Sequence, residues 1–176
     1  SQLKEINIDP KSVDYIALSH FHFDHSGNAN LFKNAKLLIQ KEEYAAIYSK
    51  DPSKFHFDPA SYSKLNKEKA IVLNGDFKVF GDDSVTILKT AGHTPGHQSL
   101  KLKLATEGTV VLSGDLYHFE KNRKHKRVPS FNFNVKDSKD SMNTIEDLLV
   151  RENATLWIQH DPKQFEKFKF SPKFYN

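Results

Sequence analysis

The sequence predicts an α/β or α+β domain built in layers. Apolar runs of strand length recur along the chain, and segments with helical patterning lie near its start, middle and end. Its 176 residues suit one domain, or one large piece of one, and 38% hydrophobic with 27% charged residues are typical of a folded core. We therefore expect a single domain over residues 1–176.

The first third of the chain is expected to alternate between short helices and strands. Residues 3–14 indicate a short helix or turn, and the apolar residues 15–19 indicate a buried strand. Three further elements are expected at residues 28–33 (helical turn), 36–40 (strand) and 41–48 (helix). Residues 51–69 mix proline, serine and aromatic residues without a clear period, which predicts a long loop or lid.

Strands dominate the middle of the chain. Leucine alternates with lysine over residues 100–104, as in a strand with one wet face, and Asn74-Gly75-Asp76 is typical of a turn. Strands are expected at residues 70–73, 77–80, 85–88, 99–104, 109–112 and 155–158. The clearest helix is expected at residues 137–150, with Asp137 or Ser138 as its N-cap.

The composition excludes several classes of protein and site. The absence of cysteine excludes disulfides, thiolate nucleophiles and sulfur-based zinc sites, but it leaves the compartment open between cytoplasm and periplasm or exterior. No apolar run reaches the roughly 18 residues of a membrane span. No segment has the pattern of a signal peptide, although we expect that Ser1 is not the natural start.

A basic run between Lys121 and Arg127 stands out against a mild net charge of +4. Such a run could contact an anionic partner, including nucleic acid. Because no aromatic-rich recognition motif accompanies it, a solvated loop is the favoured interpretation, and a nucleic-acid partner is not expected.

The strongest chemical signal is the segment Ser19-His20-Phe21-His22-Phe23-Asp24-His25. It follows directly after a predicted buried strand. In an extended backbone His20 and His22 point to the same side, and a turn would let Asp24 and His25 face a second ion. Imidazole and carboxylate together suit Zn, Fe, Mn, Co or Ni. Three histidines and an aspartate at a strand end therefore predict a metal site rather than packing.

Three more polar groups follow other predicted strands. They contain His93 and His97 in a loop bounded by glycines and a proline, then Asp115, then His160. Taken alone, His93 could cap a turn, Asp115 could cap a helix and His160 could simply be exposed. Loops at one edge of a rigid sheet can deliver their side chains to one open site, so together the groups favour ligation.

These motifs resemble those of a known family. The series His20-x-His22-x-Asp24-His25, Gly92-His93-x-Pro95-Gly96-His97, Gly114-Asp115 and His160 resembles that of the metallo-β-lactamase superfamily, and the first motif is highly specific. The likeness runs from about Val13 to His160. It implies an αββα sandwich that holds two divalent metal ions, zinc first, with Fe, Mn or Co as alternatives.

The resemblance also implies a role for each motif residue. One metal would be held by His20, His22 and His93, and the second by Asp24, His25 and His160. Asp115 would bridge the two ions. His97 would not be a ligand and would instead fix its loop by hydrogen bonding.

Within that superfamily the chain is most similar to N-acyl homoserine lactone lactonases, both around residues 13–25 and in the loop 92–100. The likeness implies a metal-dependent hydrolase that opens the lactone ring of a small acyl lactone by attack of an activated water, with quorum quenching as its role, and a homodimer is compatible with it. In that family a ββ half precedes the first motif, so we expect an N-terminally incomplete sandwich.

One departure from the lactonase pattern concerns a substrate-contacting tyrosine three residues after the bridging aspartate. Here Tyr117 lies two residues after Asp115 and His118 lies three after it. Either residue could donate a hydrogen bond to the oxyanion, and Tyr117 could equally be a packed aromatic. Asp24 or Asp115 could pass a proton to the leaving alkoxide. The candidates for an acyl-chain groove are Phe21, Phe23, Phe55, Phe57, Phe131 and Phe133, which could equally belong to the core.

Other activities use the same ligand pattern. Glyoxalase-type thioester hydrolysis, phosphodiester hydrolysis and β-lactam hydrolysis remain alternatives, and the basic run would suit a phosphodiesterase best. A non-catalytic metal-binding module is the alternative from another class. An apolar channel beside the metals favours the lactonase, whereas a basic rim favours the phosphodiesterase.

Overall fold

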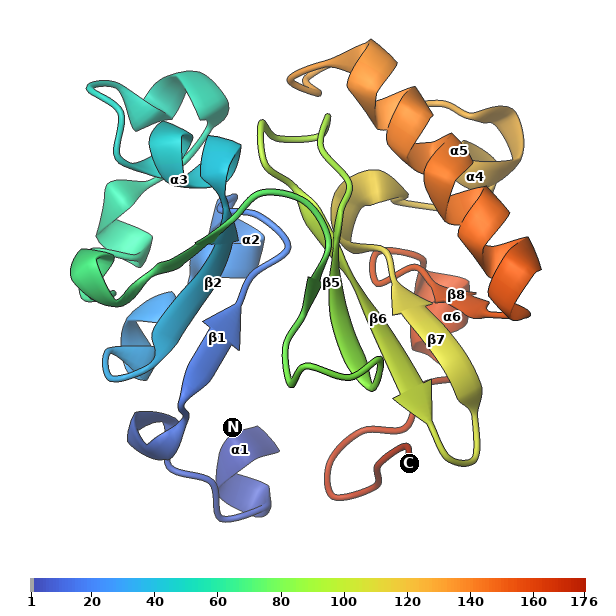
Figure 1. Ribbon diagram of the computed structural model, residues 1–176, viewed down its shortest axis with the longest axis horizontal. Helices are drawn as coiled ribbons and strands as arrows, with labels where there is room; N and C mark the ends of the chain where they lie inside the picture. Colours follow the sequence, from blue (N-terminus) through green and yellow to red (C-terminus); the bar gives the residue numbers. More distant parts are fainter. Residues whose placement is uncertain (1) are drawn as a thin grey trace.

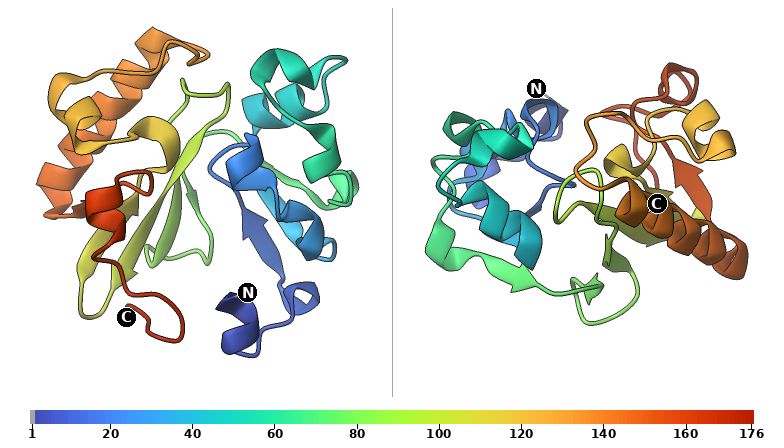
Figure 2. Two further views of the ribbon diagram at one scale, coloured as in Figure 1. Left: turned by 180° about the vertical axis from the view of Figure 1, so that it is seen from behind. Right: turned by 90° about the horizontal axis from the view of Figure 1, so that it is seen from above.

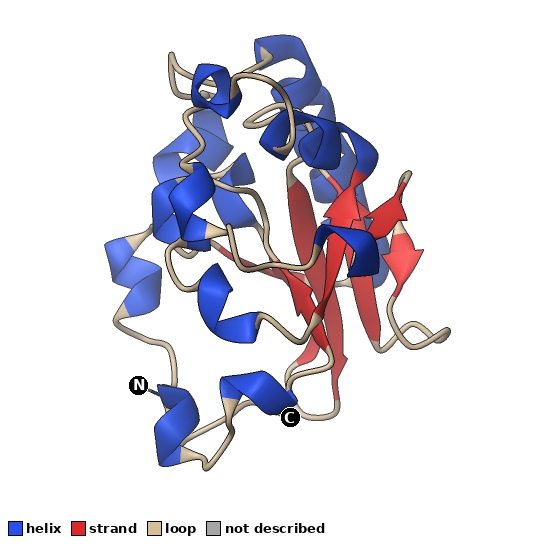
Figure 3. Cartoon of the chain, turned by 90° about the vertical axis from the view of Figure 1, so that its left-hand side faces the viewer, coloured by secondary structure: helices blue, strands red, loops and turns tan. Residues whose placement is uncertain are grey.

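The computed structural model describes residues 2–176, in which two β-sheets pack face to face and helices cover their outer sides (Figure 1). Figure 2 shows the two sheets, each with its own helices, from behind and from above, and Figure 3 shows the strands in red beside the helices in blue. This is the predicted αββα arrangement, which is confirmed.

The first sheet is parallel, with the order β1-β2-β3. Its strands are β1 (Tyr15–Ala17), β2 (Lys36–Gln40) and β3 (Ile71–Leu73). Parallel strands need crossovers, and these are supplied by short helices. They are α2 (Phe23–Ser26), η2 (Ala29–Phe32), α3 (Lys41–Ile47), η3 (Pro52–Phe55), η4 (Pro59–Ser61) and η5 (Lys67–Lys69). The chain enters the sheet through α1 (Gln2–Glu5) and η1 (Pro10–Ser12).

The second sheet has the order β4-β5-β6-β7-β8 and is antiparallel except for its last pair. Its strands are β4 (Phe77–Lys78), β5 (Val85–Lys89), β6 (Gln98–Leu104), β7 (Gly108–Leu112) and β8 (Thr155–Trp157). Its helices are η6 (Gly114–Leu116), α4 (Glu120–His125), α5 (Val135–Glu152) and α6 (Pro162–Phe165). Between residues 2 and 176, no helix combines the length and apolar character that crossing a membrane requires.

Three apolar clusters hold the layers together. Leu38 of β2, Leu73 of β3 and Ile87 of β5 form the cluster between the two sheets. A second cluster packs the outer face of the first sheet against α3 and the segment 51–69. A third packs α5, through Met142 and Ile145, against the second sheet. The central strand β2 therefore buries both of its faces, which explains its nearly continuous apolar run.

Several predicted boundaries were wrong. Helix α5 begins at Val135 because the Asn134 side chain accepts a hydrogen bond from the Asp137 backbone N–H, so the cap is Asn134. The predicted strand at 77–80 stops at Lys78. The basic run forms helix α4 rather than a loop, and Arg123 in it pairs with Glu146 at 2.8 Å.

The segment 51–69 is not a lid without structure. It contains three 3₁₀ turns, two of them capped by the side chains of Asp58 and Asn66. Phe57, Tyr62 and Leu65 are buried in the cluster beneath the first sheet. Its aromatic residues therefore serve as one outer layer of the sandwich.

The layers bring the polar loops to one place. The loops that follow β1, β5, β7 and β8 all emerge at the same edge of the two sheets, whereas both termini lie at the opposite end (Figure 1). This shared edge carries the predicted chemistry.

Candidate metal centre

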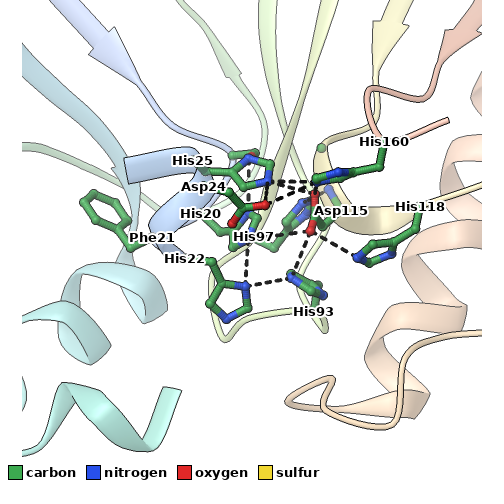
Figure 4. A network of polar contacts seen from close by, with 12 residues as sticks. His20, Phe21, His22, Asp24, His25, His93, His97, Asp115, His118 and His160 are labelled. Carbon is green, nitrogen blue, oxygen red and sulfur yellow. Dashed lines mark hydrogen bonds and ion pairs between the residues drawn. The ribbon is translucent and has the colours of Figure 1, made fainter. Parts of the chain in front are cut away.

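The structure brings the seven predicted ligands together at the sheet edge (Figure 4). They are His20, His22, Asp24, His25, His93, Asp115 and His160, whose ligand atoms form groups with separations within 4.8 Å. Two of the groups, His20-His22-His93 and Asp24-His25-His160, are the sets that the resemblance implies, and Asp115 belongs to two further groups, one with His20 and His25 and one with His93 and His118.

Asp115 lies between the two groups and is 4% exposed. Its Oδ1 lies 3.1 Å from Nε2 of both His25 and His160, and its Oδ2 lies 3.4 Å from Nε2 of His93. The Oδ1 atom is buried, and neither ring nitrogen meets it along a hydrogen-bond direction. A buried carboxylate oxygen without a hydrogen bond is costly, so this position fits a cation.

The outer hydrogen bonds of His22 and His93 determine which ring nitrogens carry hydrogen. His22 Nε2 lies 3.1 Å from the Phe55 carbonyl oxygen and His93 Nδ1 lies 3.0 Å from Asn132 Oδ1. Both partners can only accept, so both outer nitrogens must donate. The amide of Asn132 is oriented by its Nδ2, which donates to Ser138 Oγ, whose own hydrogen goes to the Asn134 carbonyl.

It follows that His22 Nδ1 and His93 Nε2 present lone pairs to each other, 3.0 Å apart. His20 Nε2 lies 2.9 Å from the same His22 atom. Two lone pairs at this distance repel unless a cation lies between them. The donor set therefore fits a divalent metal ion held by three imidazoles.

The second group is more open to solvent. His25 Nε2 and His160 Nε2 are 3.2 Å apart, and Asp24 Oδ2 lies 3.6 Å from each of them. The Asp24 side chain is 39% exposed, compared with 5% for Asp115. A site with one exposed carboxylate ligand can admit water and substrate.

Burial keeps the inner imidazoles neutral. Burial lowers the pKa of His20 well below its usual value, with His25 and His97 adding to the effect, and it lowers the pKa of His93 to about 4. Burial alone would raise the pKa of Asp115, but the surrounding His118, His160 and His25 lower it far below its usual range. Neutral imidazole and ionised carboxylate are the forms that bind metal.

Ser19 connects the two groups. Its Oγ lies 3.1 Å from His20 Nδ1 and 2.9 Å from His25 Nδ1, so one hydroxyl orients a histidine of each group. Sequence reasoning did not single out Ser19, nor Asn132 behind His93. The only available signal for Ser19 was its place next to the first motif.

His97 is placed behind the ligands, with both ring nitrogens occupied. Its Nε2 accepts a hydrogen bond from the Asp115 N–H at 2.9 Å, and its Nδ1 donates to the Thr90 carbonyl at 3.0 Å. Gly114 lies against this ring with φ +53°, and a Cβ at that position would lie 2.7 Å from His97 Nε2. The close approach and the positive φ both require glycine there.

The buried, neutral His97 is expected to make the metal-free chain less stable in acid. Burial lowers its pKa from 6.5 to about 3, so between these values the unfolded chain binds the extra proton and stability falls as pH falls. From pH 7 to pH 5 the loss is about 2 kcal/mol. Urea unfolding of the parent and of His97→Gln, which keeps an acceptor and a donor but does not titrate, measures the difference in pH dependence. Equal dependence in both proteins would contradict this reading.

Tyr117 and His118 point in different directions. The Tyr117 hydroxyl donates to Glu146 Oε1 at 2.9 Å and the ring is buried against α5, so of the two alternatives left open for Tyr117 the packed aromatic is correct and the substrate contact is not. His118 Nε2 lies 3.2 Å from Asp115 Oδ2, and its ring stacks on His160. His118 therefore faces the ligand cluster, whereas Tyr117 faces away from it.

A cavity of about 480 Å³ opens directly above the cluster, and its lining includes Phe23 and Phe131. Phe55 and Phe133 line a smaller adjoining cavity of about 40 Å³. Phe21 and Phe57 are buried in the core, so they were wrong candidates for a groove. The residues that line the larger cavity are His22, Phe23, Asp24, His56, Asp115, His118, Phe131 and His160, which include no lysine or arginine.

Comparisons with known proteins agree with this geometry. The sequence matches the family model described as the metallo-beta-lactamase superfamily over residues 1–158. It is 31% identical over 182 residues to the N-acyl homoserine lactonase AttM of Rhizobium radiobacter, covering 99% of this chain and 68% of that protein. It is also 31% identical over 172 residues to an N-acyl homoserine lactonase of Bacillus cereus, covering 98% of this chain and 65% of that protein.

A solved structure gives the same picture. The chain superposes with a TM-score of 0.84 and 28% identity on an N-acyl homoserine lactone hydrolase that holds the product N-hexanoyl-L-homoserine at its catalytic metal centre. That match covers 99% of this chain and 66% of the other. The chain thus spans about two thirds of the length of these relatives.

Proposed function

Because the chain belongs to the metallo-beta-lactamase superfamily, we propose that it forms the metal-binding part of a dinuclear hydrolase that opens the lactone ring of N-acyl homoserine lactones. Such an enzyme would quench quorum signals. The observation that carries the proposal is the pair of facing lone pairs on His22 and His93 beside the buried Asp115, in a chain about 30% identical to named lactonases over almost its whole length.

The proposed ligands follow the two groups. His20, His22 and His93 would hold the first ion and Asp24, His25 and His160 the second, with Asp115 placed between the two groups of ligands. A set of imidazoles and carboxylates without thiolates suits zinc, with iron, manganese and cobalt as alternatives. When bound, the ions supply Lewis acidity and a water of lowered pKa as the nucleophile.

The chain's own residues orient the reaction. The outer hydrogen bonds of His22 and His93 and the shared Ser19 fix the imidazoles. His118, at the wall of the cavity, is placed to donate a hydrogen bond to the carbonyl oxygen as it gains charge. Asp24, the most exposed carboxylate of the cluster, is the proposed carrier of the proton that the leaving ring oxygen takes up.

The cavity also separates the alternatives. A phosphodiester carries negative charge and would gain from a basic rim, yet neither lysine nor arginine lines the 480 Å³ cavity. The exposed rings of Phe23 and Phe131, 75% and 53% exposed, offer an apolar wall to an acyl chain. Thioester hydrolysis remains the second candidate, because a thioester is also neutral and carries an acyl group.

The proposal is tested by hydrolysis of a substrate panel with metal-loaded protein at neutral pH. The panel contains short- and long-chain acyl homoserine lactones, a thioester and a bis-aryl phosphodiester. We expect lactone opening that is lost in His22→Ala and kept in His125→Ala, a matched histidine exposed on α4. Intact lactones together with cleavage of the thioester or phosphodiester would overturn the substrate assignment.

The orientation of the loop after Asp115 predicts that substitutions at two adjacent residues, Tyr117 and His118, have very different effects on kcat. His118→Ala is expected to lower kcat for lactone hydrolysis by about 10²-fold, the usual cost of losing one donor to an oxyanion. Tyr117→Phe should leave kcat close to that of the parent, because its hydroxyl contacts only Glu146 and the Met142 carbonyl, both on α5. Steady-state kinetics of both variants decide the matter, and the reverse pattern would assign the role to Tyr117.

A further inference from the structure

A buried carboxylate on helix α3 has no part in the centre described above. Glu43 lies in the first turn of α3 and is 1% exposed. Among the residues described, none of the lysines, arginines or histidines forms an ion pair with it, unlike its neighbour Glu42, which pairs with Lys89 at 2.6 Å. Burial raises its pKa to about 7, against hydrogen bonds that lower it. A carboxylate in such surroundings is costly to bury unless its oxygens are hydrogen-bonded.

The two oxygens of Glu43 accept hydrogen bonds from two different loops. Oε1 accepts from the Phe21 N–H at 3.2 Å, and Oε2 accepts from the Gly96 N–H at 2.8 Å. Phe21 lies between His20 and His22 in the loop after β1, and its side chain points away from the cluster (Figure 4). Gly96 lies in the loop after β5 that carries His93.

The contact at Gly96 leaves no room for a side chain. A Cβ there would lie 2.3 Å from the Glu43 backbone nitrogen and 2.6 Å from its Cβ. The loop of the second sheet is thus pressed directly against the first turn of α3. Gly96 does not have a positive φ, so the close approach of the two backbones, and not the backbone conformation, is what requires glycine here.

Glu43 therefore joins loops that belong to different sheets. Gln98 also joins them, but at their bases: its N–H donates to the Ser19 carbonyl at 2.9 Å. The Glu43 carboxylate contacts the loops nearer to the ligands: Phe21 is adjacent to His22, and Gly96 lies three residues after His93. These are the two histidines whose lone pairs face each other 3.0 Å apart.

We propose that Glu43 is a positioning residue, which holds the His22 and His93 loops at the separation that a shared metal ion requires. This inference rests on the proposed first ion and deepens it. The second group depends less on Glu43, because the hydrogen bonds of its carboxylate go to the Phe21 and Gly96 N–H groups and none goes to Asp24, His25 or His160. Loss of Glu43 should therefore weaken binding of the first ion more than binding of the second, whereas a residue needed only for folding would weaken binding of both equally.

The variant Glu43→Gln keeps the shape of the side chain but replaces one accepting oxygen with an amide that donates. One of the two loop N–H groups then loses its acceptor. Gln40→Ala is the matched control, because the buried Gln40 side chain also makes two hydrogen bonds to the backbone, with Gly75 at 2.9 and 3.1 Å. Glu43→Asp, which is one methylene shorter, serves as a second variant if Glu43→Gln does not fold.

Metal binding is measured by titrating metal-free protein with Co²⁺ and following visible absorption, after circular dichroism has established that each variant is folded. Each variant is also made in two backgrounds: His160→Ala, which keeps the first group, and His93→Ala, which keeps the second. We expect Glu43→Gln to weaken Co²⁺ binding by about 10–100-fold in the His160→Ala background, as for other residues that orient ligands. In the His93→Ala background its effect should be much smaller, and Gln40→Ala should have no effect in either.

Three outcomes would overturn the inference. Unchanged binding by Glu43→Gln in the His160→Ala background would show that Glu43 does not set the ligand spacing. Equal weakening in both backgrounds, or in Gln40→Ala as well, would reduce its role to folding. If the parent chain bound no Co²⁺, the metal assignment would fail with it, whereas a parent that binds two ions but leaves lactones intact would refute only the proposed substrate.

Discussion

Asp115→Asn is expected to remove hydrolytic activity almost completely. Residues that merely orient ligands already contribute about 10–100-fold, so loss of the carboxylate between both ligand groups should cost about 10³-fold or more in kcat. Asp115 contacts His25, His93, His118 and His160, and its charge is the only buried negative charge in the centre of the cluster. An asparagine would place an NH₂ group among these nitrogens and could no longer neutralise two cations.

The measurement is steady-state lactone hydrolysis together with the number of metal ions bound per chain. Asp161→Asn is the matched control, because Asp161 is also largely buried but caps α6 through Oδ1, which asparagine can replace, and only the hydrogen bond from the Glu120 N–H to Oδ2 is lost. The control should retain activity and two ions. If Asp115→Asn bound both ions and kept its activity, the bridging assignment would be wrong.

The cluster could be predicted because its geometry is local. The alternation of His20 and His22 and the turn at Asp24 put four side chains on one short segment, and the remaining ligands each follow a strand. The edge at which those strands end is set by the layered fold. Residue type and spacing therefore predicted a metal site, whereas the division of the ligands into two groups came from the resemblance to the metallo-β-lactamase superfamily.

What escaped prediction depends on contacts between distant segments. Tyr117 and His118 are adjacent, so only the backbone direction after the 3₁₀ turn η6 decides that the tyrosine faces α5 and the histidine faces the cluster. Asn132 reaches His93 across 39 positions of sequence.

Glu43 was not among the predicted site residues, and the sequence predicted only the helix in which it lies. Its contacts with the Phe21 and Gly96 N–H groups lie 22 and 53 residues away along the chain. No local pattern encodes such a bridge, because it exists only once α3 packs against loops from both sheets.

Removal of divalent metal is expected to abolish activity and to lower the melting temperature of the chain. The neutral imidazoles of His22 and His93 face each other with lone pairs, and Asp115 Oδ1 is buried without a hydrogen bond, so these groups destabilise the fold until a cation binds. A ligand at 1,000 times its Kd stabilises by about 4 kcal/mol per site, which is about 8–16 °C for a chain of this size. Calorimetry before and after chelation, and after Zn²⁺ is restored, measures the effect.

The same experiment on His22→Ala separates the two groups of ligands. This variant loses one of the three ligands of the first ion, and it relieves the contact between the lone pairs of His22 and His93. The difference in stability between its metal-loaded and metal-free forms should therefore be smaller than in the parent. The shift on chelation should then fall to about half, since only the second site still contributes its binding free energy. His125→Ala should show the full shift. A melting temperature that is the same with and without metal in the parent would mean that the cluster is a hydrogen-bonded network of imidazoles, and the hydrolytic mechanism would lose its source of nucleophile.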